Sequence, residues 1–131
     1  MNGRHGSGTI LVVDDEEVIR QAARAALAKS GFEVLVAENG QAGVDLFKEQ
    51  SGRISLVILD LTMPVMGGEQ AFDLLRSIKP DVPILLASGY DEIDALARTA
   101  DKNFAGFLQK PFDVNRLIEA VGSVLVRAGK E

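Results

Sequence analysis

Residues 54–68 read ISLVILDLTMPVMGG, and this stretch decides the fold. Its opening run is almost entirely apolar, which is typical of a parallel strand that is buried on both faces. The run ends at Asp60, although an aspartate is rarely fully buried without a partner. An earlier apolar run, residues 9–13, ends in the same way at Asp14 and Asp15. Two such strands predict a polar site at one edge of a sheet.

Apolar runs alternate with helical patterns about five times along the chain. This alternation predicts a parallel sheet flanked by helices. In the helix expected at 91–101, Ile93, Leu96 and Ala97 form a thin apolar stripe that should face the sheet. The expected strands are 9–13, 33–37, 54–60, 82–87 and 105–108, and the expected helices are 16–30, 41–49, 67–79, 91–101 and Asp113 to about Arg127.

Length and composition favour one domain with its own core, because the chain has 131 residues of which 47% are hydrophobic. We expect a flexible leader or expression remnant at 1–8, the domain at 9–127 and a tail at 128–131. No apolar run approaches the roughly 20 residues that a membrane span needs. The net charge of −5 argues against direct nucleic-acid binding. The absence of cysteine excludes disulfides and suggests the cytoplasm.

Four polar features follow the predicted strands: the pair Asp14-Asp15, then Asp60, Ser88 and Lys110. The carboxyl ends of parallel strands meet at one edge of the sheet, where open α/β sheets bind ligands. Crowded carboxylates need protons or a cation to be stable together. Oxygen ligands point to Mg²⁺ or Mn²⁺. A metal would also let Asp60 approach a phosphoryl group, with Lys110 and Ser88 stabilising the phosphoryl oxygens.

With these motifs in this order, the sequence resembles the receiver domains of response regulators in two-component phosphorelay signalling. The resemblance extends from residue 9 to about 127 and implies a flavodoxin-like, doubly wound five-stranded parallel sheet in order 2-1-3-4-5 with five helices. The matching segments are Leu11-Val12-Val13-Asp14-Asp15, Asp60-Leu61-Thr62-Met63-Pro64-Val65-Met66-Gly67-Gly68, Ser88-Gly89 and Lys110-Pro111-Phe112.

The resemblance assigns the acidic residues to a phosphoacceptor site. Asp60 would be the aspartate phosphorylated by the phosphohistidine of a sensor histidine kinase or a histidine phosphotransfer protein. Asp15 would be the main metal ligand, with Asp14 assisting and with Asp60 and the backbone carbonyl of Thr62 completing the protein ligands. The chain would then be a signalling phosphoacceptor and not an enzyme, although it would assist its own phosphorylation and dephosphorylation.

The same resemblance assigns a switch to the last two strands. Ser88 would be the switch hydroxyl and Lys110 the phosphate-binding lysine, and the Lys110-Pro111 peptide bond would be cis. Phe107 occupies the position of the switch aromatic residue, which in the family is often tyrosine. Phosphorylation would draw Ser88 inward and let this ring turn in, remodelling the surface of the fourth helix and fifth strand.

Two further positions would set the lifetime of the phosphoryl group in such a domain. They lie two residues after the phosphorylated aspartate and two after the switch hydroxyl, and here they are Thr62 and Tyr90. Neither side chain is an amide or an acid that would orient an attacking water well. We therefore expect slow self-dephosphorylation, with Tyr90 partly shielding the phosphoryl group.

Three other functions fit the sequence less well. A haloacid-dehalogenase-like phosphatase would also use Asp60 as a nucleophile, but it requires a second acid where this chain has Thr62, and a cap domain is missing. A Rossmann nucleotide-binding domain requires a glycine-rich first turn, whereas residues 14–17 are all acidic. An interaction module that has lost phosphorylation would not need Asp60, Asp15, Ser88 and Lys110.

The sequences of two segments favour a particular kind of parent protein. Residues 59–64 and 107–111 resemble receivers fused to hybrid histidine kinases. We expect no DNA-binding or enzymatic output domain after Arg127, so the chain is interpreted as a stand-alone regulator or as one receiver from a longer protein. Its setting would be cytoplasmic, including as part of a membrane-anchored hybrid kinase.

Overall fold

The computed structural model describes residues 8–129; the predicted leader, apart from Gly8, and the last two residues of the predicted tail lie outside this range. The strands are β1 (Thr9–Val13), β2 (Glu33–Ala37), β3 (Ile54–Asp60), β4 (Ile84–Ser88) and β5 (Gly106–Gln109). The helices are α1 (Glu17–Lys29), α2 (Gly40–Gln50), α3 (Gly68–Ile78), α4 (Glu92–Arg98) and α5 (Val114–Arg127).

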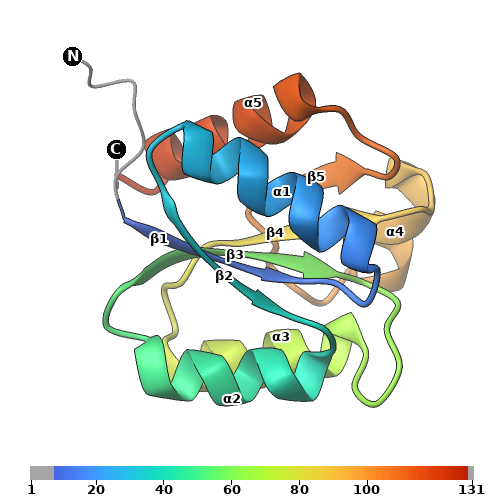
Figure 1. Cartoon of the computed structure of the whole chain (residues 1–131). Helices are drawn as coiled ribbons and strands as arrows, with labels where there is room; N and C mark the ends of the chain where they lie inside the picture. Colours follow the sequence, from blue (N-terminus) through green and yellow to red (C-terminus); the bar gives the residue numbers. More distant parts are fainter. Residues whose placement is uncertain (1–7, 130–131) are drawn as a thin grey trace.

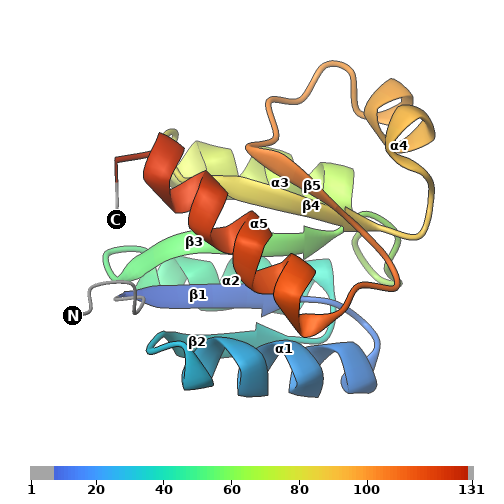
Figure 2. The same cartoon turned by 90° about the horizontal axis from the view of Figure 1, so that it is seen from above.

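All five strands pair in parallel, in the order β2-β1-β3-β4-β5, so the predicted topology is confirmed. Helices α1 and α5 cover one face of the sheet, and α2 and α3 cover the other (Figure 1). Helix α4 lies apart from the α2–α3 pair, toward the carboxyl ends of β4 and β5 (Figure 2). Because β1 and β3 pair directly, their carboxyl ends lie side by side.

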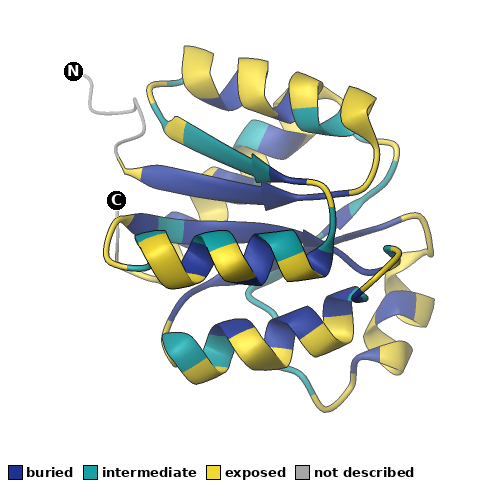
Figure 3. Ribbon diagram, turned by 60° about the horizontal axis from the view of Figure 1, so that its bottom comes forward, coloured by how far each residue is buried: buried dark blue, intermediate teal, exposed yellow. Residues whose placement is uncertain are grey.

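Successive residues of the central strands enter two separate cores. On β3, Leu56 and Ile58 pack beneath α1 and α5, whereas Val57 and Leu59 pack beneath α2 and α3. Alternate side chains of a strand point to opposite faces, so a strand covered on both sides must be apolar throughout. This explains the nearly continuous apolar run of residues 54–59, which only Ser55 interrupts. Figure 3 shows the buried strands and the buried inner faces of the helices.

Helix α4 differs from its prediction. It ends at Arg98, so it is shorter than the expected 91–101. The predicted apolar stripe is wrong, because Ile93 is 81% and Leu96 47% exposed, whereas Ala95 is buried. Ala95 packs against Leu61 and Leu86. A small residue at the contact lets the helix approach the sheet closely, and the larger apolar side chains of α4 face solvent.

Among the helices formed within residues 8–129, none combines the length and the apolar character that crossing a bilayer would require.

Candidate functional site

Three aspartates meet where β1 and β3 end. Val13 pairs with Leu59 across the two strands, so the residues that follow, Asp14 and Asp60, are neighbours. Carboxylate oxygens of Asp14, Asp15 and Asp60 all lie within 4.8 Å of one another. Asp14 and Asp60 are buried, whereas Asp15 is exposed. The structure thus brings together the three acids that the sequence analysis singled out.

Lys110, the residue after β5, reaches across to this cluster. Its Nζ lies 3.0 Å from Oδ2 of Asp14, 2.9 Å from Oε1 of Glu16 and 3.4 Å from Oδ2 of Asp60. Its backbone N–H donates a 2.8 Å hydrogen bond to the carbonyl of Ser88, which fixes the end of β5 against β4. Glu16 is a member of the site that the sequence analysis did not assign; its place next to the Asp14-Asp15 pair was the only signal.

The site contains more carboxylates than cationic side chains to neutralise them. Burial and the nearby Asp14 carboxylate raise the pKa of Asp60 from 3.8 to about 7, although the Lys110 ammonium opposes this rise. Burial alone would lower the pKa of Lys110, but hydrogen bonds to Glu16 and Asp14 and the charge of Asp60 raise it above its usual value. Lys110 therefore stays protonated, and a single ammonium faces the carboxylates of Asp14, Glu16 and Asp60, with Asp15 beside them.

This donor set fits a hard divalent cation. All three clustered ligand atoms are carboxylate oxygens, which suit such ions. Asp14 and Asp60 are almost completely buried, and Lys110 neutralises only part of their charge. Buried carboxylates that outnumber their cations are stabilised by a proton or a metal ion. The residues present can therefore hold a metal.

A cavity of about 620 Å³ opens over Asp60. Its walls include Asp15, Thr62, Tyr90 and Lys110. Such a cavity leaves room for a group larger than a metal ion beside the Asp60 carboxylate. Thr62 and Tyr90, the two predicted lifetime positions, both line it.

The end of β4 contributes a hydroxyl to the same edge. Ser88 is buried, and its Oγ accepts a 3.0 Å hydrogen bond from the backbone N–H of Tyr90. The hydroxyl proton of Ser88 remains available for donation. The peptide bond between Lys110 and Pro111 is cis.

The loop after Asp60 is held tightly to the strand end. The N–H of Gly68 donates a 2.9 Å hydrogen bond to the carbonyl of Leu61. A Cβ atom at Gly68 would lie 2.4 Å from the carbonyl oxygen of Asp60, so only glycine fits this approach. Val65, which is 80% exposed, has a φ of 69°, an unusual conformation for a β-branched residue. This loop holds Thr62 beside Asp60.

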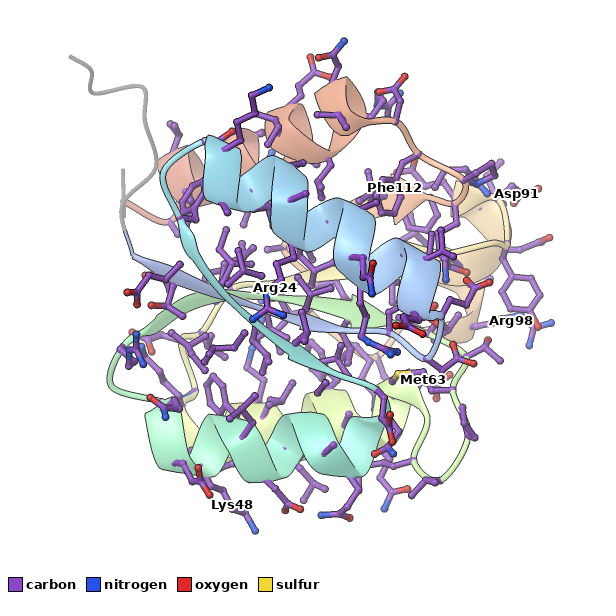
Figure 4. All side chains as sticks on the ribbon, in the orientation of Figure 1. Arg24, Lys48, Met63, Asp91, Arg98 and Phe112 are labelled. Carbon is purple, nitrogen blue, oxygen red and sulfur yellow. The ribbon has the colours of Figure 1, made fainter. Side chains whose placement is uncertain are left out.

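Phe107 on β5 pairs with Leu86 of β4 and does not line the cavity over Asp60. It is half-buried and packs, with Phe104, against the small cluster of Leu61, Leu86 and Ala95. That cluster joins the loop after Asp60 to α4. Figure 4 shows Met63 of this loop and Arg98 of α4 toward the same end of the molecule.

Residues 10–122 match the model of the response regulator receiver domain. The parallel sheet in order 2-1-3-4-5 and the acidic pocket at its carboxyl edge are in keeping with that match. The chain belongs to the response regulator receiver domain family.

Relatives of several architectures are similar to the chain. It is 38% identical to the sensor kinase CckA of Brucella abortus (strain 2308) over 92% of its own length, but spans only 13% of that kinase. It is 34% identical to the chemotaxis protein CheY of Bacillus subtilis (strain 168), covering 88% of this chain and 96% of CheY. The crystal structure of the receiver domain from the hybrid histidine kinase CckA is 32% identical, with a TM-score of 0.76 over 90% of this chain and 99% of that one.

Proposed function

We propose that the chain accepts a phosphoryl group on Asp60 from the phosphohistidine of a sensor histidine kinase or histidine phosphotransfer protein. One observation carries the proposal: the buried Asp60 carboxylate lines a cavity, within 4.8 Å of two further carboxylates and 3.4 Å from a lysine ammonium. Membership of the receiver family and the similarity to sensor kinases support the same donor.

We assign the metal site to Asp14, Asp15 and Asp60 with the backbone carbonyl of Thr62, and the metal to Mg²⁺ or Mn²⁺. When bound, the metal would supply positive charge that offsets the repulsion between the Asp60 carboxylate and the incoming phosphoryl oxygens. Asp15 is exposed and forms none of the bonds to Lys110, so it is free to be the principal ligand.

The side chains of the site then divide the chemistry among them. An Oδ of Asp60 attacks phosphorus, and the bond from phosphorus to the donor imidazole nitrogen breaks as the electron pair returns to the ring. Lys110 neutralises charge on the transferred phosphoryl oxygens, and the Ser88 hydroxyl donates a hydrogen bond to one of them. Positioning and charge stabilisation account for catalysis in phosphoryl transfers of this kind.

The switch proposal concerns Ser88 and Phe107. A hydrogen bond from Ser88 to the phosphoryl group would pull the end of β4 toward Asp60. Phe107 would follow into the space behind Ser88 and repack the cluster that holds Ala95 of α4. A local change of charge would thereby alter the surface of α4 and β5.

Thr62 and Tyr90 are proposed to prolong the phosphoryl lifetime. Both line the cavity over Asp60, and neither carries a carboxylate or amide that would orient water for attack. We expect Thr62→Asn and Tyr90→Glu to accelerate release of phosphate, and an unchanged half-life in both variants would refute this role.

We propose that residues 9–127 form the receiver domain and that it works in the cytoplasm, as a stand-alone regulator or as the receiver of a membrane-anchored hybrid kinase. The similarity to CckA, described as a hybrid histidine kinase, supports the second arrangement. The net charge of −5 supports a protein partner and not a nucleic acid.

The test is incubation with Mg²⁺ and phosphoramidate, followed by intact mass spectrometry. The wild type should gain one phosphoryl group, Asp60→Asn should gain none, and Asp45→Asn, at an exposed position of α2, should behave as the wild type. Omitting Mg²⁺ should suppress the adduct. Steady release of phosphate with no adduct would instead support the haloacid-dehalogenase-like phosphatase, and an adduct in Asp60→Asn would contradict the assigned acceptor.

A further inference from the structure

Two neighbouring cavities share a wall at the phosphorylation site. The first, of about 620 Å³, contains Asp60 and Lys110 in its walls. The second, of about 370 Å³, is lined by Arg98 and Met63 among others. Thr62 and Tyr90 line both cavities. Tyr90 therefore stands between the space over Asp60 and a second space in which its ring could be accommodated.

Arg98 contacts the Tyr90 ring from the second cavity. The guanidinium carbon of Arg98 lies 4.1 Å from the centroid of the ring, a cation–π contact. Arg98 lines the second cavity but is absent from the walls of the first. Within residues 8–129, Arg98 forms no ion pair with a carboxylate. Its charged group is therefore not held by an ion pair away from the ring.

Burial does little to fix the Tyr90 side chain. The residue is 38% exposed, and the hydrogen bond to Ser88 holds only its backbone N–H. Arg98 is the last residue of α4, and one turn earlier Ala95 anchors that helix to the sheet. The ring thus lies between the space over Asp60 and the Arg98 guanidinium, which occupies part of the second cavity and contacts the ring there.

We infer that Arg98 is a positioning residue that holds the Tyr90 ring over the phosphorylation site and so slows hydrolysis of phosphorylated Asp60. The inference rests on the proposed function. In that hydrolysis a water oxygen bonds to phosphorus, the bond from phosphorus to the Asp60 oxygen breaks, and the Asp60 carboxylate and inorganic phosphate are released, with the water proton passing to phosphate or solvent.

Loss of Arg98 should open the site to water. Without the guanidinium, the ring is free to turn into the 370 Å³ cavity, which widens the approach to Asp60. An exposed cation–π contact is a weak interaction, so Arg98→Ala should shorten the phosphoryl half-life only about two- to fivefold. The rate of phosphorylation by phosphoramidate should change less, because Arg98 does not reach the cavity that contains Asp60.

The experiment follows decay of the phosphorylated domain by intact mass after phosphoramidate is removed, with Mg²⁺ kept constant. It compares the wild type, Arg98→Ala, Arg98→Lys, Tyr90→Ala and the double variant of Arg98→Ala with Tyr90→Ala. Arg24→Ala, at an exposed arginine of α1, is the matched control. Melting temperatures confirm that each variant is folded, and Arg98→Lys keeps the test valid should Arg98→Ala unfold.

If Arg98 acts through Tyr90, the effects of the two alanine substitutions are not additive. The double variant should decay no faster than Tyr90→Ala, Arg98→Lys should restore part of the half-life, and Arg24→Ala should match the wild type. An unchanged or longer half-life in Arg98→Ala, or additive effects in the double variant, would overturn the inference. A wild type that forms no adduct would overturn the proposed function instead.

Discussion

Two neighbouring residues of β3, one in the apolar middle of the sheet and one at its carboxyl edge, are both buried but contribute oppositely to stability. Leu59 is 0% exposed and the next residue, Asp60, is 4% exposed. Burying the leucine stabilises the fold by about 2 kcal/mol, whereas burying a carboxylate costs free energy unless it is fully compensated. The stability of this domain therefore comes from the two cores, and the buried carboxylate at the edge of the sheet lowers it.

Other features of the edge point the same way. Val65 has a left-handed backbone conformation, and α4 is held mainly through the small residue Ala95. Substitutions in the middle should therefore destabilise the domain, while substitutions that remove a buried charge or backbone strain at the edge should stabilise it.

The largest expected effect is in the middle. Leu59→Ala should lower the free energy of unfolding by about 2–5 kcal/mol, because it leaves a cavity in a fully packed core. Leu96→Ala, on the exposed face of α4, should change it by less than about 0.5 kcal/mol. Urea denaturation without metal measures both. Equal losses of unfolding free energy at the two positions would contradict the stabilising role assigned to the core.

Asp60→Asn should stabilise the metal-free domain in a pH-dependent way. The pKa of Asp60 is raised from 3.8 to about 7, so the native state holds this proton more tightly than the unfolded state. The wild type therefore loses stability as the pH rises from about 4 to about 7, whereas the asparagine variant does not titrate here.

The advantage of Asp60→Asn should accordingly grow across that pH window and level off above it. Its upper limit is about 4 kcal/mol, since one pKa unit corresponds to about 1.4 kcal/mol. Urea denaturation in the presence of a chelator, repeated from pH 4 to pH 8, measures the difference. An advantage that shrinks with rising pH would contradict the raised pKa.

Binding of a divalent cation should stabilise the wild-type domain, because it neutralises the clustered carboxylates at the edge of the sheet. Mg²⁺ at about 100 times its dissociation constant should add about 2.7 kcal/mol to the free energy of unfolding. Asp15→Asn should lose most of this gain while keeping its metal-free stability, because Asp15 is exposed. Thermal melts with and without Mg²⁺ make the comparison, and full stabilisation of Asp15→Asn would remove that residue from the ligand set.

The smallest effect is expected at Val65. Glycine adopts its φ of 69° without strain, so Val65→Gly should stabilise the domain by up to about 1 kcal/mol. Val126→Gly, at an exposed helical position of α5, should be destabilising instead. Urea denaturation of the two variants compares them, and a loss at both positions would show that Val65 is not strained.

The sequence predicted the sheet well because buried parallel strands leave a clear trace. The apolar runs ending at Asp14 and Asp60 lie where the structure has β1 and β3, and the acids meet as expected. That meeting follows from topology alone, since the carboxyl ends of parallel strands share one edge.

Helix α4 and the finer contacts could not be predicted in the same way. The spacing of apolar residues predicted that Ile93 and Leu96 face the core. This short helix at the sheet edge instead buries only Ala95 there. The contacts of Glu16 with Lys110 and of Arg98 with Tyr90 depend on side-chain geometry between distant segments. No local pattern encodes such contacts.

We propose that the carboxyl edge of the sheet holds a divalent cation beside Asp60. A crystal structure grown with saturating Mn²⁺ tests it directly, because anomalous scattering locates the ion. We predict one Mn²⁺ bound by the carboxylates of Asp15 and Asp60 and the carbonyl of Thr62, with Asp14 beside it. The proposed metal site is wrong if Mn²⁺ binds only at carboxylates elsewhere on the surface. In that case the Asp60 cluster would keep Lys110 as its counter-charge and hold no metal.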